Sequence, residues 1–267
     1  MNRGRHGPKL GAVRLLLTLA YDGRPFDGWQ SQPGGNTVQD LLENAASAIA
    51  KQPLRVHGSG RTDAGVHALA QTAHFDPPEG LTMGPDNWLA ALNTKLPRTI
   101  RVMAAREVDA GFHARFSACG KTYHYELSTS PVLTPFRHGL AWHLPRGLDA
   151  GLLAAALDAY RGRHDFEAFC ARRGNETEAT DHHRTLTRAE VSPSGGGLRL
   201  TFTGDGFLYK MVRLLVGTAV QVATDRMPLG EIAALLDQPA GLPHGRSSHC
   251  APADGLFLEA VHYDSPS

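Results

Sequence analysis

The chain has 267 residues, of which 42% are hydrophobic and 20% charged, enough for one large globular domain or two modest ones. Its formal net charge of +1 does not by itself indicate a polyanionic partner. Its longest apolar runs are too short to span a bilayer or to form a signal peptide. The three cysteines, far apart and without a C-x-x-C pair, indicate neither a disulfide framework nor a zinc site, and they fit a reducing cytoplasm.

The first half of the chain predicts alternating strands and helices after a basic tail, residues 1–11, that we expect to be disordered. A helix is predicted from Thr37, because apolar residues then recur on one helical face and Asp40 stands where the partner in a capping box would. Short apolar runs, and runs in which apolar and polar residues alternate, predict the strands. Pro53 ends the first predicted helix and Pro97 ends the second. The expected order is strand 12–21, helix 37–52, strand 54–59, strand 67–75, helix 85–96 and strand 100–108.

The second half predicts the same order of elements without a detectable sequence repeat. Its expected elements are strand 121–128, helix 149–160, strands 186–191 and 198–203, helices 207–224 and 229–236, and strand 256–263. The order β-α-β-β-α-β is the ferredoxin-like signature. We therefore predict an α+β protein with two ferredoxin-like halves, residues 12–110 and 111–264, whose sheets merge or face each other across a cleft.

A glycine-rich loop, GSGRTDAGVH at residues 58–67, lies between two predicted strands of the first half. Its glycines permit positive φ and close approach of another backbone. Arg61 and Asp63 are two residues apart, so both side chains can project to the same side of an extended loop. An arginine within ~4–6 Å would lower the pKa of the aspartate and keep it ionised. Such a carboxylate can act as a base, a metal ligand or a nucleophile.

Each of these roles makes a further demand on the sequence. A metal site would need more ligands, and His67 and His74 form a poor pattern for one. A hydrolytic triad of Ser59, Asp63 and His67 lacks a nucleophile elbow and an oxyanion-hole motif. A surface turn with an exposed ion pair, worth under ~1 kcal/mol, also explains the residues. The loop by itself therefore leaves the function open.

Five sequence blocks, in order, resemble the tRNA pseudouridine synthase A family. The central block, GRTDAGVHALAQTAHF from Gly60, carries the family's G-R-T-D-x-G-V-H motif. The other blocks are YDGRPFDGWQSQP (21–33), FHARFSACGKTYHY (112–125), FLYKMVRLLVGT (207–218) and APADGLFLEAVHY (251–263). The matches run from Leu15 to Tyr263, and only the tail, residues 172–183 and residues 238–249 match poorly.

The resemblance implies a fold, a partner and a reaction. The fold is two ferredoxin-like halves that share one extended, mainly antiparallel sheet with a central cleft. The protein would be a cytoplasmic homodimer without metal or cofactor, and it would bind no membrane. Its substrate would be tRNA, at uridines 38, 39 and 40 of the anticodon stem-loop.

The resemblance also implies which residues form the site. Asp63 matches the catalytic aspartate, and Arg61 is the candidate to fill the space that a flipped base leaves. Tyr123 matches a substrate-contacting tyrosine, although a strand tyrosine packed in the core is the alternative. Arg213 of the M-V-R motif is expected to pair with Asp63, and Leu256 is expected to pack against the uracil or to belong to the core.

Tyr125, two residues beyond Tyr123 on the same strand face, is expected to be the core residue of the pair. Weaker candidates for RNA contacts are His113, Arg115, His182 and His183.

Conversion of uridine to pseudouridine breaks the N1–C1′ bond and forms C5–C1′ with no net gain or loss of atoms, so it requires neither a metal nor a redox cofactor. Asp63 could attack C1′, attack C6 or initiate loss of the C2′ proton, and the sequence does not choose among these routes. Two rival functions remain: a synthase of the same superfamily with other RNA targets, and a non-catalytic RNA-binding module, against which the intact Asp63 argues.

Overall fold

The structure is a computed structural model that describes residues 14–171, 181–237 and 247–264. The predicted disordered tail, residues 1–11, lies outside this range, as do most of the two poorly matched segments. None of the described helices is long and apolar enough to cross a membrane.

The first half contains the predicted order of elements. A threonine caps the first helix as expected: the Thr37 hydroxyl accepts a hydrogen bond from the backbone N–H of Asp40. The elements are β1 (Arg14–Tyr21), α1 (Val38–Ala50), β2 (His57–Gly58), β3 (His67–Phe75), α2 (Pro85–Lys95) and β4 (Ile100–Val108).

The strand β2 is much shorter than the predicted strand 54–59. The backbone N–H groups of Leu54 and Val56 donate to the side chains of Ser47 and Glu43 on α1 rather than to a neighbouring strand. Because these two donors are already satisfied by the helix, the start of the segment does not pair with β3, and the pairing begins at His57.

The second half contains the predicted elements and two additional short strands. These strands, β6 and β7, have two and four residues, too few to produce a readable alternation. The elements are β5 (Ala118–Ser128), β6 (Trp142–His143), α3 (Ala150–Asp158), β7 (Gly162–Asp165), β8 (His183–Ser194), β9 (Gly197–Gly204), α4 (Met211–Ala223), α5 (Gly230–Asp237) and β10 (Leu256–Tyr263).

The start of α4 differs from the prediction, which placed it at Phe207. The helix begins at Met211, because Lys210 adopts the left-handed conformation with φ 59° and ψ 9°. A non-glycine residue in this region cannot continue a right-handed helix. Residues 207–210 therefore form a turn, and this turn lines the pocket described below.

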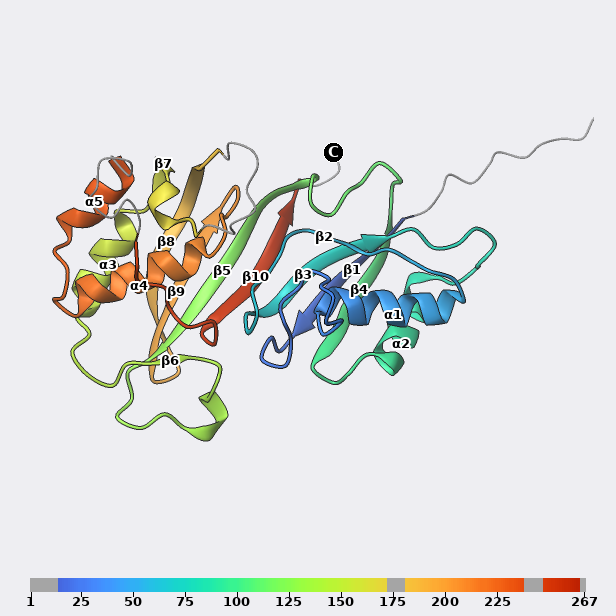
Figure 1. Cartoon of the computed structure of the whole chain (residues 1–267), viewed down its shortest axis with the longest axis horizontal. Helices are drawn as coiled ribbons and strands as arrows, with labels where there is room; N and C mark the ends of the chain where they lie inside the picture. The colour runs from blue at the N-terminus through green and yellow to red at the C-terminus, as the bar shows by residue number, and fades with distance from the viewer. Residues whose placement is uncertain (1–13, 172–180, 238–246, 265–267) are drawn as a thin grey trace, which may run out of the picture.

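The two halves share one sheet, in the order β4-β1-β3-β10-β5-β9-β8-β7, with β2 and β6 paired beside it (Figure 1). The last strand, β10, pairs antiparallel with β5 and parallel with β3, so it joins the halves. Each half has the ferredoxin-like strand order, β4-β1-β3-β2 and β10-β5-β9-β8. This confirms the predicted fold class, whereas the boundary between the halves near residue 110 stays a prediction.

The helices lie in two groups, α1 with α2 over the first half and α3 with α4 over the second (Figure 1). Trp88 of α2 is fully buried and packs edge-to-face on Phe75 of β3, with ring centroids 4.9 Å apart. The α4 helix is buried along most of its length. The pocket described below is lined by residues from both halves, including residues of β5 and the first residue of β10.

Candidate active site

A cavity of about 690 Å³ lies between the two halves. Its walls come from the glycine-rich loop, β5, the start of β10, the turn at 205–210 and the start of α4. Four of the five predicted site residues line it: Arg61, Asp63, Tyr123 and Leu256. The fifth, Arg213, reaches Asp63 from α4.

The loop that carries Asp63 is held in place by the first motif block. The backbone N–H of Trp29 donates to the carbonyl oxygen of Thr62, and the hydroxyl groups of Thr62 and Tyr21 lie 2.8 Å apart. Gly28 packs so closely on the loop that a Cβ there would lie 2.7 Å from the Thr62 oxygen. The conformation of the loop therefore depends on residues some forty positions earlier in the chain.

Asp63 and Arg213 form the expected pair across the two halves. The Arg213 Nη1 lies 3.4 Å from Asp63 Oδ2, and the two side chains are only 16% and 23% exposed. The Arg213 Nε donates to the carbonyl oxygen of Ala251 at 2.8 Å, which orients the guanidinium toward the loop. The carboxylate thus lies beside a positive charge that is itself anchored.

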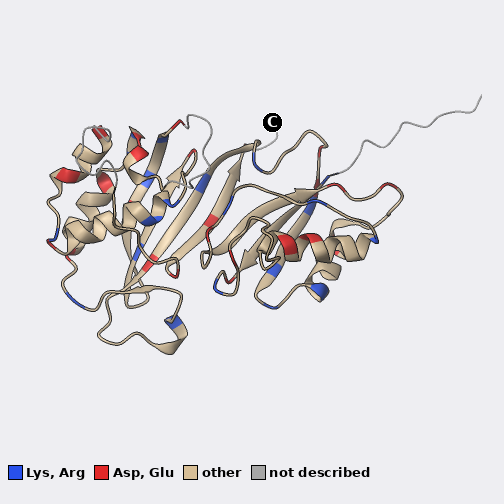
Figure 2. Cartoon of the chain, in the orientation of Figure 1, with Lys and Arg blue, Asp and Glu red and all other residues tan. Residues whose placement is uncertain are grey.

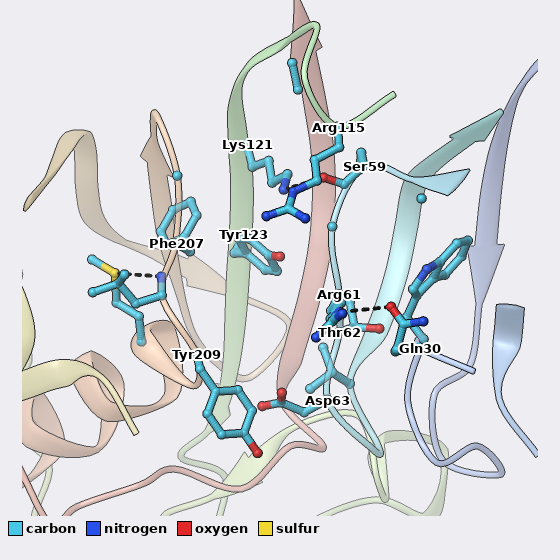
Figure 3. A pocket seen from close by; sticks show the side chains of 18 of the residues that line it. Gln30, Ser59, Arg61, Thr62, Asp63, Arg115, Lys121, Tyr123, Phe207 and Tyr209 are labelled. Atoms are coloured by element: carbon cyan, nitrogen blue, oxygen red, sulfur yellow. Dashed lines mark hydrogen bonds between the residues drawn. The ribbon is translucent and has the colours of Figure 1, made fainter. Parts of the chain in front are cut away.

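Tyr123 stands on β5 with its ring toward the pocket (Figure 3). It is 8% exposed, and its ring meets that of Phe207 edge-to-face at 5.0 Å. Burial, with smaller contributions from Tyr21 and Asp63, raises the pKa of Tyr123 above its ordinary value, so the phenol stays neutral.

Tyr125, the next residue on the same face of β5, is fully buried and donates its hydroxyl to the carbonyl oxygen of Pro252 at 2.8 Å. The prediction that Tyr125 is the core residue of the two is therefore confirmed.

Arg61 and Leu256 lie at different depths of the pocket. Arg61 is exposed, and its Nε donates to Gln30 Oε1 at 2.9 Å, a bond drawn in Figure 3. Leu256 is the first residue of β10, is 5% exposed and pairs in register with Tyr125. It is thus both a core residue and part of the pocket wall.

The proposed hydrolytic triad is not assembled. The Ser59 hydroxyl is buried and donates to Gln71 at 2.7 Å. His67 accepts from the backbone N–H of Gly23 through Nδ1 and contacts the carbonyl oxygen of Gly139 through Nε2. Both ring nitrogens and the serine are therefore engaged in structural bonds. In the described part of the chain, no group of three or more His, Cys, Asp or Glu side chains could hold a metal ion.

The pocket also contains residues that the sequence analysis did not single out, notably Lys121, Phe207 and Tyr209. Lys121 lies two residues before Tyr123 on β5, so the strand period places both on one face. The two-residue spacing from Tyr123 could therefore have predicted Lys121 as a pocket residue. Of the weaker candidates, His113 and Arg115 line the pocket, whereas His182 and His183 are not among its lining residues.

Comparison with known proteins shows the family to which the chain belongs. A family model described as tRNA pseudouridine synthase matches residues 18–117 and 156–264. The tRNA pseudouridine synthase A of Akkermansia muciniphila is 53% identical over 254 residues, which covers 94% of this chain and 95% of the relative. The protein of that name from Shouchella clausii is 42% identical, and the match covers 95% of this chain and 94% of the relative. The protein of that name from Solidesulfovibrio magneticus is 44% identical, and the match covers 95% of this chain and 92% of the relative.

The chain therefore belongs to the tRNA pseudouridine synthase A family, which confirms the resemblance carried by its five motif blocks.

Proposed function

We propose that this protein isomerises uridine to pseudouridine at positions 38, 39 and 40 of the tRNA anticodon stem-loop, with the Asp63 carboxylate acting on a flipped-out uridine. As a member of its family the protein is an isomerase, and its relatives are named for tRNA pseudouridine synthesis. The positions in tRNA and the role of the aspartate are the parts we propose.

The observation that carries the proposal is the Asp63–Arg213 pair inside the pocket. A carboxylate that lies beside an anchored arginine, and is 23% exposed, is restricted in orientation yet can still meet a ligand. The cavity of about 690 Å³ is in the range of small-molecule sites, so a nucleoside fits in it.

The residues around Asp63 have distinct tasks in this proposal. The neutral ring of Tyr123 supplies a stacking face for the uracil, and its hydroxyl can move the proton released from C5. Leu256 packs against the base from β10. The half-buried site excludes water while the uracil is detached from C1′.

A uridine paired in a stem must leave the stack before it reaches Asp63, at a cost of a few kcal/mol. Arg61 is exposed two residues from Asp63, on the side of Gln30, and its planar guanidinium can fill the vacated space. We propose this role for Arg61.

The proposed partners are tRNA and a second copy of the chain, in the cytoplasm, with no membrane, metal or cofactor. Basic residues occur on strands and loops of both halves, among acidic ones (Figure 2). A net charge of +1 does not attract RNA by itself, so binding depends on local arginines and lysines that contact phosphates. Raising the salt concentration should therefore weaken tRNA binding steeply, and a flat response would contradict phosphate-driven binding.

The test is to incubate purified protein with unmodified tRNA transcripts and to map pseudouridine by carbodiimide primer extension. Asp63→Asn should abolish product, whereas Asp86→Asn, the same change at an exposed position of α2, should not alter it. Product at positions 38–40 that survives in Asp63→Asn would refute the role of Asp63. Product only elsewhere would indicate another target, and none in either protein would favour a binding module.

A further inference from the structure

A second charged feature occupies the pocket wall above Tyr123. Lys121 of β5 extends toward the glycine-rich loop and donates from Nζ to the carbonyl oxygen of Ser59 at 3.0 Å. The Arg115 guanidinium lies beside the Lys121 side chain (Figure 3). Two cations therefore lie side by side on the same wall of the cavity that contains Asp63.

The position of Lys121 also explains a glycine of the motif. A Cβ at Gly60 would lie 2.5 Å from the Lys121 Nζ, so the absence of a side chain there leaves room for the ammonium. The ammonium has three N–H donors, and within the described residues one of them is hydrogen-bonded, to the carbonyl oxygen of Ser59. Two donors thus remain for a ligand in the pocket.

The charges around Lys121 do not neutralise it. Within the described part of the chain, the neighbouring charge that lowers the pKa of Lys121 is the like charge of Arg115, and no ion pair includes Lys121 or Arg115. Burial, reinforced by Arg115, lowers the pKa of Lys121 to about 8. A partly buried lysine beside an arginine without a counter-charge is an arrangement that an anion would stabilise.

Phe116 indicates which anion this would be. The residue is 76% exposed at the pocket edge, with its ring centroid 5.6 Å from the Arg115 guanidinium carbon and 4.4 Å from the centroid of the His113 ring. An exposed aromatic face next to paired cations is how proteins hold single-stranded nucleic acid, with the base stacked and the phosphate paired. A free phosphate would pair with the cations and make no contact that requires the exposed ring.

We propose that Lys121 and Arg115 bind a backbone phosphate of the RNA strand next to the uridine held at Asp63, and that Phe116 stacks on a neighbouring base. This inference rests on the proposed function, since it takes RNA as the occupant of the pocket. It adds a phosphate subsite that places the strand relative to Asp63.

If Lys121 binds a phosphate, then RNA binding should be coupled to protonation of Lys121. Burial lowers the pKa of Lys121 to about 8 in the free protein, and a bound phosphate raises that pKa. Binding should therefore take up protons, and affinity should fall as pH rises from 7 to 9. The other charged or titratable groups that line the pocket are His57, Arg61, Asp63, His113, Tyr123, Arg184, Asp205, Tyr209 and Lys210.

The experiment measures calorimetric binding of an unmodified tRNA transcript to Asp63→Asn protein, in two buffers that differ in ionisation enthalpy. In this background, Lys121→Met should weaken binding about tenfold and reduce the slope of log affinity against log salt by about 1. Lys95→Met is the matched control, because it removes an exposed lysine from α2 outside the pocket, and it should change neither quantity.

Lys121→Arg separates the lysine from the other titrating groups. Arginine keeps its charge at every accessible pH, so tRNA should still bind while the proton uptake due to Lys121 disappears. A second variant, Gly60→Ala, displaces the ammonium without removing it and should weaken binding in the same direction as Lys121→Met.

Each outcome decides the inference. A Lys121→Met protein that is folded and binds tRNA like Lys95→Met would overturn the subsite. If the wild type still binds and isomerises tRNA in that case, the proposed function is supported and the phosphate subsite is refuted. If no variant, including Asp63→Asn itself, binds tRNA, the proposed function and the subsite are both refuted.

Discussion

Replacing Gly217 of α4 by alanine tests how the helix that carries Arg213 is seated. A Cβ at this position would lie 1.8 Å from the carbonyl oxygen of His249 and 3.1 Å from the backbone N of Ala251. The nearest obstacle is main chain, so no side-chain rotation can relieve the clash. The helix and the segment at 249–251 would have to move apart.

Two effects of opposite sign set the magnitude. Alanine is a better helix former than glycine by about 1 kcal/mol, which favours the variant. Overpacking of a filled site costs about 1–3 kcal/mol, and a backbone clash at Gly217 belongs at the upper end of that range. We therefore expect Gly217→Ala to lower the free energy of unfolding by about 2 kcal/mol, a melting-temperature drop of roughly 4–8 °C.

The assay is urea denaturation and thermal melting of purified protein. Gly230→Ala is the control, because Gly230 is also helical, is exposed, and has nothing within 4 Å of the added Cβ, so it should be neutral or stabilising. Catalytic activity should fall in Gly217→Ala as well, since Ala251 bonds to Arg213 through both its backbone groups. A Gly217→Ala protein as stable as the wild type would refute the reasoning.

Three further predictions follow from the site and its surroundings. Arg213→Lys cannot hold Asp63 and the Ala251 carbonyl at once, so kcat should fall about 10–100-fold, and an unchanged kcat would contradict the positioning role. Tyr123→Phe keeps the stacking ring but loses the hydroxyl, so kcat should fall about 100-fold with tRNA affinity unchanged if the phenol moves a proton. Burial, with neighbouring positive charges, lowers the pKa of His74 from its ordinary value of 6.5 to about 4. Below pH 6.5 the unfolded state therefore binds more protons than the folded state. Unfolding free energy should therefore fall as pH drops from 6.5 toward 4, and a denaturation series should show this fall reduced in His74→Asn.

Local patterns predicted most of the elements because their causes lie within a few residues. The strands β3, β4 and β10 have the predicted bounds, since alternation and flanking turn residues mark them directly. The cap at Thr37 was equally local. The short strand β6 pairs only two residues with β5, and no local signal exists for it.

The errors have tertiary causes. Residues 207–210 carry a helical pattern, yet Lys210 is left-handed and the segment turns toward the pocket. At the start of the predicted strand 54–59, the backbone N–H groups of Leu54 and Val56 bond instead to side chains of α1. In both places, contacts made elsewhere in the fold outweigh the local preference of the segment.

The sequence alone determined the two ferredoxin-like halves, the family and the identities of Asp63, Tyr123 and Arg213 as site candidates. Only the tertiary structure decided which side chains meet. Asp63 and Arg213 are 150 positions apart, and they approach each other because β10 inserts between β3 and β5. The same register brings Lys121 under Gly60 beside Arg115. Periodicity reports neighbours along one strand or helix, whereas a site between two halves depends on long-range strand pairing that no local pattern encodes.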